Sequence, residues 1–532
     1  MSHSAVRPLP LGRSNFSVLR LKNCIYVDKT DLLSKLCEND DKVFLARPRR
    51  FGKSLLVSAF ESLFRYGLRE FEGLKIEQTW TDRTYNVIRL DFSLTKDFSS
   101  VSEFLSLLNG MFGDAVSEAG LSILNDADDP VGSFRTMLSR QPLSSLVLLI
   151  DEYDAPLTAH LDNTELLEGV QQQLSRFYAA VKSHDGCLRF FFMTGITKFS
   201  NTSIFSSFNN LLDISLNPIY GTVLGYTEEE IIEYFEPFLV SAERTLNLSR
   251  QECLAQLRDH YDGFSFDISA QNHVYCPWSV LNFFKFPSLG FQNYWYASAG
   301  QPSVLMKYLA AHSLEKPLAY SAEKTVLLSD LSGPRQYSDI SPNVLLTQAG
   351  YLTIRAVRNN TVLLGYPNRE VADSLAALYA EELLKGQSIE PLGKPSIADV
   401  MAGGSLDEIV SRFNDAVNAV DYLRYPISDE ATCRAYLQVL LIGAAMMPHV
   451  EVHSALGRSD LETDAGTRHW VFEFKYAEDD SQADAKLQQG EQQIRSRRYG
   501  QSDRMKCLMR AVLVFSAAQR QFVRWKLTDG DF

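Results

Sequence analysis

Short, continuously apolar runs that alternate with helical patterns constrain the first part of this 532-residue chain most strongly. The runs occupy 43–45, 86–92, 145–150 and 188–194, with a shorter one at 213–216. Strands that are apolar on both faces are typical of parallel sheets covered by helices on both sides. The sequence therefore predicts an α/β domain, built on a parallel sheet, that ends near residue 225.

After residue 225 the pattern changes to helices interrupted by aromatic, turn-rich segments. We expect a mainly helical middle region at 226–385, in which Asn359 and Asn360 separate two apolar runs and indicate a small β-hairpin. A stretch rich in Gly, Pro and Ser at 386–404 is the predicted linker. Residues 405–532 then show the order α-β-β-β-α-β and form the last predicted domain. Its expected strands are 450–454, 459–462, 469–476 and 508–516.

Composition argues against several protein classes. Apolar residues make up 45% and charged residues 22%, as in folded globular proteins. The net charge of −13 argues against a general coat for nucleic acid but leaves room for a local basic site. Seven scattered cysteines without a CxxC pair indicate neither a disulfide framework nor a zinc ribbon. Because apolar runs are too short to span a bilayer and no signal core begins the chain, we expect a cytoplasmic protein without a membrane partner.

The segment 47–54, RPRRFGKS, lies between the first apolar run and a helix, which is the setting of a phosphate-binding loop. Gly52 lets the backbone approach a phosphate, Lys53 would neutralise the β- and γ-phosphates, and the Ser54 hydroxyl would ligate Mg²⁺. Arg47 stands where the usual pattern has its first glycine. An ordinary basic turn is the alternative interpretation. The predicted nucleotide-contacting residues are Arg49, Arg50, Phe51, Gly52, Lys53, Ser54 and Leu55.

Two carboxylates favour the phosphate-loop interpretation. Asp151 and Glu152 follow an apolar run, and the carboxyl ends of parallel strands face the crevice in which such a loop binds its ligand. We expect Asp151 to hold Mg²⁺ and Glu152 to orient or deprotonate the attacking water. Lys198, after the next apolar run, is the candidate sensor of the γ-phosphate, with a plain surface lysine as the alternative. Asp154 is expected to cap the following turn.

A second group of chemically active residues lies near the C-terminus. Glu473 and Lys475 point to one face of a strand, and Asp460 lies on the preceding strand of a predicted hairpin. Two carboxylates suit Mg²⁺ or Mn²⁺, and a lysine beside them can orient or activate water. Glu451, one strand earlier, is a further candidate metal ligand. A surface salt bridge on a hairpin is the alternative.

Local charge supports the metal-site interpretation. Residues 486–532 contain 10 Lys and Arg against 4 Asp and Glu, a net charge of +6 in an acidic chain. A basic patch beside an acidic metal site suits binding of a phosphate backbone, although a solvated helix face is the alternative. Clustered arginines follow the site, and neighbouring glutamines are candidates to hold the lysine or the DNA backbone. These residues are Arg495, Arg497, Arg498, Gln492 and Gln493.

Together these motifs resemble a known family. Four segments are similar to segments of bacterial AAA-ATPase-like proteins that carry a C-terminal domain of the PD-(D/E)XK nuclease superfamily. They are YVDKTDLL, FLARPRRFGKSLLVSAFESLF, LLIDEYDAPL and FMTGITKFSNTSIFSSFNNLLDIS. GRSDLE and WVFEFKYA resemble the nuclease segment, and the resemblance covers about residues 8–520. It implies a P-loop NTPase sheet domain followed by an α/β restriction-endonuclease-like domain. The family has arginine at the position of Arg47, whereas the proline of the superfamily's name is missing before Asp460.

The resemblance implies roles for the candidate residues. Lys53, Ser54, Asp151 and Glu152 match the nucleotide motifs, whereas Asp460, Glu473 and Lys475 match the nuclease triad. Our first hypothesis is an ATP-binding and ATP-hydrolysing protein that cuts nucleic acid, DNA before RNA, with Mg²⁺ or Mn²⁺, and a defence role is associated with it. The alternative is a nucleotide-switched protein that binds nucleic acid or protein through an inactive nuclease-like domain. A homo-oligomer and the source of an arginine finger are left open.

Overall fold

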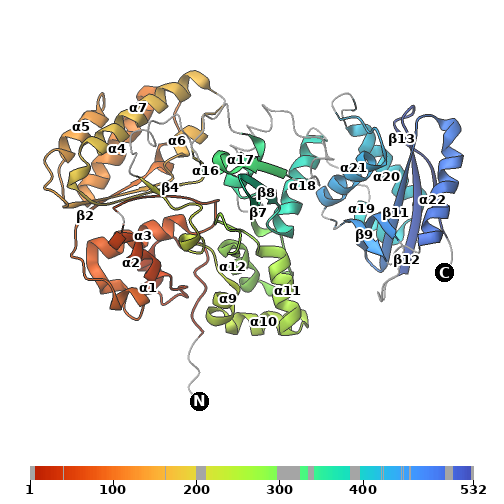
Figure 1. The fold of residues 1–532 in the computed structure, drawn as a ribbon, viewed down its shortest axis with the longest axis horizontal. Coiled ribbons are helices and arrows are strands. Elements are labelled where there is room, and N and C mark those ends of the chain that lie inside the picture. Colours follow the sequence, from red (N-terminus) through yellow and green to blue (C-terminus); the bar gives the residue numbers. More distant parts are fainter. Residues whose placement is uncertain are drawn as a thin grey trace, which may run out of the picture. The chain divides into compact units, whose positions relative to one another are not determined.

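The computed structural model describes residues 6–39, 41–161, 163–198, 211–295, 324–332, 341–383, 396–420, 422, 425–444, 446, 448–454, 457–497 and 507–528 (Figure 1). These residues form two compact units, of which the first ends at Val371 and the second begins at Ala372. Each unit has its own large sheet and its own helices.

The first unit is built on a fully parallel, five-stranded sheet with the strand order β2-β3-β4-β1-β5. The strands are β1 (Lys42–Ala46), β2 (Asn86–Asp91), β3 (Leu146–Asp151), β4 (Leu188–Gly195) and β5 (Leu212–Asp213). Every residue of β1 and β3 is buried, as expected for strands covered on both faces. The predicted α/β architecture is confirmed.

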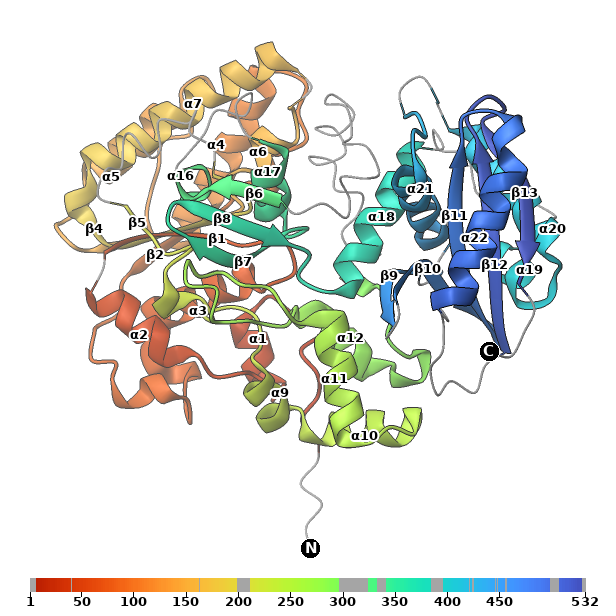
Figure 2. The same ribbon diagram turned by 45° about the vertical axis from the view of Figure 1, so that its right-hand side comes forward.

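Helices cover both faces of this sheet (Figure 1, Figure 2). One face carries α4 (Val101–Glu118), α5 (Pro130–Leu138) and α7 (Thr164–Ser183), with the short α6 (Ala155–Thr158) nearby, and the other carries α1 (Phe16–Leu21), α2 (Thr30–Asn39) and α3 (Lys53–Tyr66). Phe112, Phe134 and Phe177 join α4, α5 and α7 through ring contacts. These ring contacts pack the three helices against one another over one face of the sheet.

A helical region and a small sheet complete the first unit. They comprise α9 (Glu228–Tyr234), α10 (Glu236–Leu246), α11 (Arg250–Tyr261), α12 (Pro277–Lys285), α16 (Leu328–Ser332), α17 (Pro342–Ala349), β6 (Lys324–Leu327), β7 (Thr353–Arg358) and β8 (Thr361–Gly365). Asn359 adopts a positive φ of 56° between β7 and β8, which pair as the predicted hairpin. Ile25 and Val27 pack into the core of α9–α12, so the helical region and the N-terminal segment share one core.

The second unit is a mixed five-stranded sheet with the order β13-β12-β11-β10-β9, in which β11 and β12 run parallel and the other pairs antiparallel. Its elements are α19 (Ile397–Gly403), α20 (Leu406–Ala419), α21 (Glu430–Gly443), β9 (His449–Ser454), β10 (Gly457–Ala465), β11 (Arg468–Ala477), α22 (Ala483–Arg497), β12 (Cys507–Ser516) and β13 (Gln521–Leu527). The order α-β-β-β-α-β is present, and β13 extends it by one edge strand that the sequence analysis does not predict.

Helix α18 (Arg369–Leu383) contains the point at which the first unit ends. The predicted boundaries at residues 225, 385 and 404 stay predictions. Residues 386–395 of the predicted linker lie outside the described residues, whereas its later part contains helix α19. Within the described parts of the chain, every helix is too short or too polar to cross a bilayer.

Candidate functional site

The predicted phosphate loop connects buried strand β1 to helix α3. Gly52 precedes the helix with a φ of 94°, in the left-handed region where glycine is favoured, and Arg50 has a φ of 72°. The 14-residue helix begins directly after Gly52, so its first backbone N–H groups are available to an anion. The backbone is therefore arranged as phosphate binding requires.

Lys53 is folded back onto this loop. Its Nζ donates to the carbonyl oxygens of Arg47 and Pro48, both at 3.0 Å. Burial lowers the pKa of Lys53, and the nearby carboxylates of Asp151 and Glu152 oppose that shift. A bound phosphate would replace the two weak carbonyl acceptors with a stronger, charged one.

Arg47 has a structural role. Its guanidinium donates to the carbonyl oxygens of Ala46 at 2.9 Å, Ser215 at 2.7 Å and Tyr220 at 3.1 Å, and lies 4.4 Å from the ring centroid of Phe266. The side chain is 1% exposed, and burial lowers its pKa to about 9. Arg47 therefore anchors the start of the loop to the segments that surround it, and it is not among the residues that line the cavity beside the loop.

The carboxylates at the end of β3 lie beside the loop, as predicted. The Ser54 hydroxyl hydrogen-bonds to Asp151, whose carboxylate also lies 3.9 Å from Arg89. Burial raises the pKa of Asp151 and of Glu152. Glu152 has a φ of 48°, a conformation that costs a non-glycine residue about 1 kcal/mol and that is concentrated at functional sites.

Lys198 and Asp154 make contacts that differ from the roles predicted for them. Lys198 Nζ is 2.6 Å from the Asp213 carboxylate on β5, and Lys198 is not among the residues that line the cavity beside the phosphate loop. Asp154 does not cap the turn that follows it, contrary to the prediction. Its Oδ2 instead accepts from the backbone N–H groups of Ile196 and Thr197 and from the Thr197 hydroxyl, which fixes the loop after β4.

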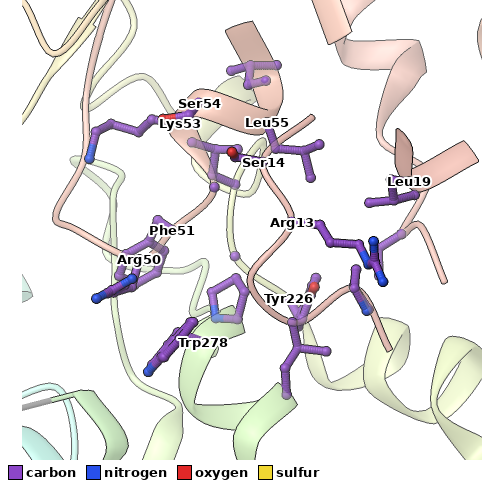
Figure 3. A pocket seen from close by; sticks show the side chains of 18 of the residues that line it. Arg13, Ser14, Leu19, Arg50, Phe51, Lys53, Ser54, Leu55, Tyr226 and Trp278 are labelled. Atoms are coloured by element: carbon purple, nitrogen blue, oxygen red, sulfur yellow. The ribbon is translucent and has the colours of Figure 1, made fainter. Parts of the chain in front are cut away.

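A cavity of about 570 Å³ opens beside the loop (Figure 3). It is lined by every predicted loop residue from Arg49 to Leu55 and by Glu152. It is also lined by residues that the sequence analysis does not predict, because they lie far from the motif in the chain. The main ones are Arg13, Ser14, Leu224, Tyr226, Pro277 and Trp278. The volume suits a ligand of nucleotide size.

The loop is also packed against the aromatic segments of the helical region. Phe51 contacts Phe264 and Phe266 edge-on, with centroids 4.9 and 5.0 Å apart. The Arg50 guanidinium lies 4.4 Å from the ring centroid of Trp278 on α12. The phosphate loop therefore packs directly against the helical region.

The second predicted group converges on β10 and β11. The Asp460 Oδ2 accepts from the backbone N–H of Phe474 at 2.8 Å, and Lys475 Nζ lies 2.7 Å from Glu473 Oε1. Burial, together with the charge of Asp460, raises the pKa of Glu473 to about 7, and burial also raises the pKa of Asp460. Burial opposes the charge of Lys475, but the adjacent Glu473 outweighs it and raises the pKa of the lysine.

One carboxylate oxygen of this group is left without a partner. Glu473 Oε2 is buried and makes no hydrogen bond with any described residue. An unsatisfied buried carboxylate oxygen is costly, and beside the second carboxylate of Asp460 it fits a hard divalent cation as ligand. The donor set therefore suits Mg²⁺ or Mn²⁺.

Glu430, at the first turn of α21, joins this site without having been predicted. Its Oε2 is 3.4 Å from Lys475 Nζ, so the lysine lies between two carboxylates. The capping signal of Asp429 marks the start of α21 in the sequence, but no spacing relates that helix to β11.

Further C-terminal candidates are Glu451, Arg498, Gln492 and Arg495. Glu451 lies on β9, but its side chain is outside the described residues, as is Arg498. Gln492 and Arg495 are exposed on α22. Part of the basic charge is neutralised, because Arg524 pairs with Asp484 at 2.8 Å and Lys526 with Glu491 at 2.8 Å.

Comparison with known proteins gives two family matches. Residues 10–205 match a family described as predicted AAA-ATPase, and residues 432–525 match a PD-(D/E)XK nuclease superfamily domain. The chain is also 30% identical, over 380 residues, to an uncharacterized protein from the vnfD 5′ region of Azotobacter chroococcum mcd 1. That match covers 69% of each chain.

Proposed function

The chain belongs to the AAA-ATPase-like family and carries a C-terminal PD-(D/E)XK nuclease superfamily domain, and from this premise we propose that it binds and hydrolyses ATP and cuts nucleic acid in a metal-dependent reaction. The observation that carries the nuclease half is the convergence of Asp460, Glu473 and Lys475, with Glu473 Oε2 buried and unsatisfied among the described residues.

The ATPase half rests on the first unit. Lys53 would exchange the carbonyls of Arg47 and Pro48 for phosphate oxygens, while Ser54 and Asp151 would hold Mg²⁺. Glu152 lines the cavity and would orient or deprotonate the attacking water. Its raised pKa makes it a better base than an ordinary exposed carboxylate.

The nuclease half rests on the second unit. A cation bound by Asp460 and Glu473 would polarise the scissile phosphodiester and lower the pKa of a bound water. Lys475, held by Glu473 and Glu430, would orient that water or stabilise the charge that develops on the phosphate. DNA as substrate, a cytoplasmic location and a role in defence are finer parts of the same proposal.

Cleavage assays with conservative variants test this proposal. Glu473→Gln and Asp460→Asn keep side-chain shape and should abolish Mg²⁺- or Mn²⁺-dependent cutting of plasmid, single-stranded DNA or RNA, while ATP turnover continues. Glu478→Gln, an exposed change just beyond the site, is the matched control and should leave cutting unchanged.

Lys53→Ala should abolish ATP turnover, with exposed Lys22→Ala as its control. Cutting that persists in both carboxylate variants would refute the nuclease assignment. ATP turnover without cutting of any substrate would favour the alternative, a nucleotide-switched binding protein.

A further inference from the structure

The cavity beside the phosphate loop extends well beyond the phosphate-binding groups. At one end lie Lys53, Ser54 and the first turn of α3, and in Figure 3 the Arg13 and Tyr226 side chains lie apart from Lys53. Several apolar side chains also line the cavity. They include Leu19, Ile25, Val27, Tyr226 and Leu281, together with Leu224, which lies next to Gly52 of the loop. An apolar wall continuous with a phosphate site suits the nucleoside end of a nucleotide.

Arg13 lines this cavity, and its charge has no partner among the described residues. The structure gives its guanidinium no hydrogen bond or ion pair with any described residue, and its Nε is buried without a partner. A buried donor left unsatisfied is costly, so such a group calls for a ligand or another explanation. Lys29, by contrast, also lines the cavity but pairs with Glu230 at 2.8 Å and donates to the Thr222 carbonyl.

The position of Arg13 is set by the fold. A turn precedes it, in which the Arg13 N–H donates to the Pro10 carbonyl and Gly12 has a φ of 72°. After it, the Phe16 N–H donates to the Ser58 hydroxyl of α3 at 3.0 Å, in a buried setting. The segment that carries Arg13 is thus anchored to the helix that follows the phosphate loop.

We propose that Arg13 is a nucleoside-binding residue, which donates hydrogen bonds to acceptor atoms of the ribose or base of a purine nucleoside triphosphate held against the apolar wall. This inference rests on the proposed ATP binding. The guanidinium carries only donors, so its partner in the nucleoside is an oxygen or a ring nitrogen. The phosphates are already served by Lys53 and the loop, so Arg13 selects the organic part of the ligand.

Calorimetric titration of the full-length protein with ATP and with inorganic tripolyphosphate tests this role. Arg13→Met should weaken ATP binding about tenfold or more, as expected for a lost charged hydrogen bond, and should leave tripolyphosphate binding unchanged. Arg13→Gln, which keeps donors, should recover part of the affinity. Arg7→Met, an exposed change in the same segment, should behave as the wild type.

The outcomes separate this inference from the proposed function. If Arg13→Met binds ATP as the wild type does, or loses ATP and tripolyphosphate in equal measure, the nucleoside role is overturned and ATP binding stands. If the wild-type protein binds neither ligand, both proposals fall. Equal melting temperatures of Arg13→Met and Arg7→Met would show that Arg13→Met is folded. If Arg13→Met is misfolded, Arg13→Gln decides: compared with the wild type, it must lose affinity for ATP but not for tripolyphosphate.

Discussion

At the scale of single residues, Arg47 shows how a departure from a motif can have a structural cause. The usual phosphate loop has glycine there, but three backbone carbonyls and the ring of Phe266 surround this guanidinium. Arg47→Gly should therefore lower the free energy of unfolding by about 2 kcal/mol or more, because buried acceptors lose a charged donor. Urea unfolding, followed by circular dichroism, measures this change.

Arg49→Gly is the matched control, since Arg49 is an exposed residue of the same loop. It should unfold close to the wild type. A stable Arg47→Gly protein would contradict the bracing role and would indicate that the loop needs no support at its first position.

Residue identities at both sites were partly predictable from the sequence. Asp151 directly follows an apolar run, Lys53 lies in the turn after another, and Asp460 and Glu473 lie on two expected strands of one hairpin, so strand patterns place all four. Arg13 and Glu430 could not be placed, because they reach their sites only through tertiary packing of segments with no fixed spacing to the motifs. Charge alone was also insufficient, as the ion pair of Lys198 with Asp213 was not foreseen.

At the scale of elements, helix α12 contacts the phosphate loop through Trp278. Arg50 lies on the Trp278 ring and adopts a positive φ, so a change of loop conformation on phosphate binding should alter the environment of the indole. ATP should therefore change the intrinsic fluorescence, and Trp278→Phe should remove most of that change. Trp525→Phe, in the second unit, is the control and should retain it.

Helix α11 carries a pH-sensitive element. Burial lowers the pKa of His260 below 6.5, although the Gln256 carbonyl opposes the shift, and the ring stacks on Phe291 near Arg369 and Asp259. The unfolded chain then binds protons more tightly, so stability is present above pH 6.5 and is lost as the pH falls through the native pKa.

His260→Phe should make stability less dependent on pH between 7.5 and 5.5, a range of about two units around the ordinary histidine value. Urea unfolding at several pH values measures the slope. Exposed His273→Phe is the control and should keep the wild-type slope. Equal slopes in wild type and His260→Phe would argue against a neutral, buried imidazole.

Elements were more predictable than single residues where burial was continuous. β1, β3 and β4 lie almost fully in the core, and their apolar runs identify them directly. β13 was missed because it is an edge strand in which Phe522 is the one buried residue, while Arg524 and Lys526 are exposed. Such a strand carries too few apolar residues for a run to be visible.

At the scale of the whole molecule, charge is distributed unevenly. The chain carries a net charge of −13, whereas residues 486–532 carry 10 basic and 4 acidic groups. A nucleic acid is repelled by most of such a protein, so we expect it to bind where the C-terminal basic residues lie and to depend steeply on salt. The ion pairs of Arg524 and Lys526 already use part of this charge.

Exposed Arg495 on α22 is therefore expected to contact phosphate. The measurement uses a Glu473→Gln background, which prevents cutting. Fluorescence anisotropy with a labelled duplex at 50–200 mM salt gives the slope of log affinity against log salt. Over this range of salt, losses of affinity of about 10³–10⁵-fold are typical. Arg495→Gln should reduce that slope by about 0.9, the value for one lost phosphate contact on duplex DNA. Arg244→Gln, an equally exposed arginine on α10, should leave it unchanged. Equal effects of the two substitutions would mean that total charge, rather than the basic segment beside the carboxylate site, governs binding.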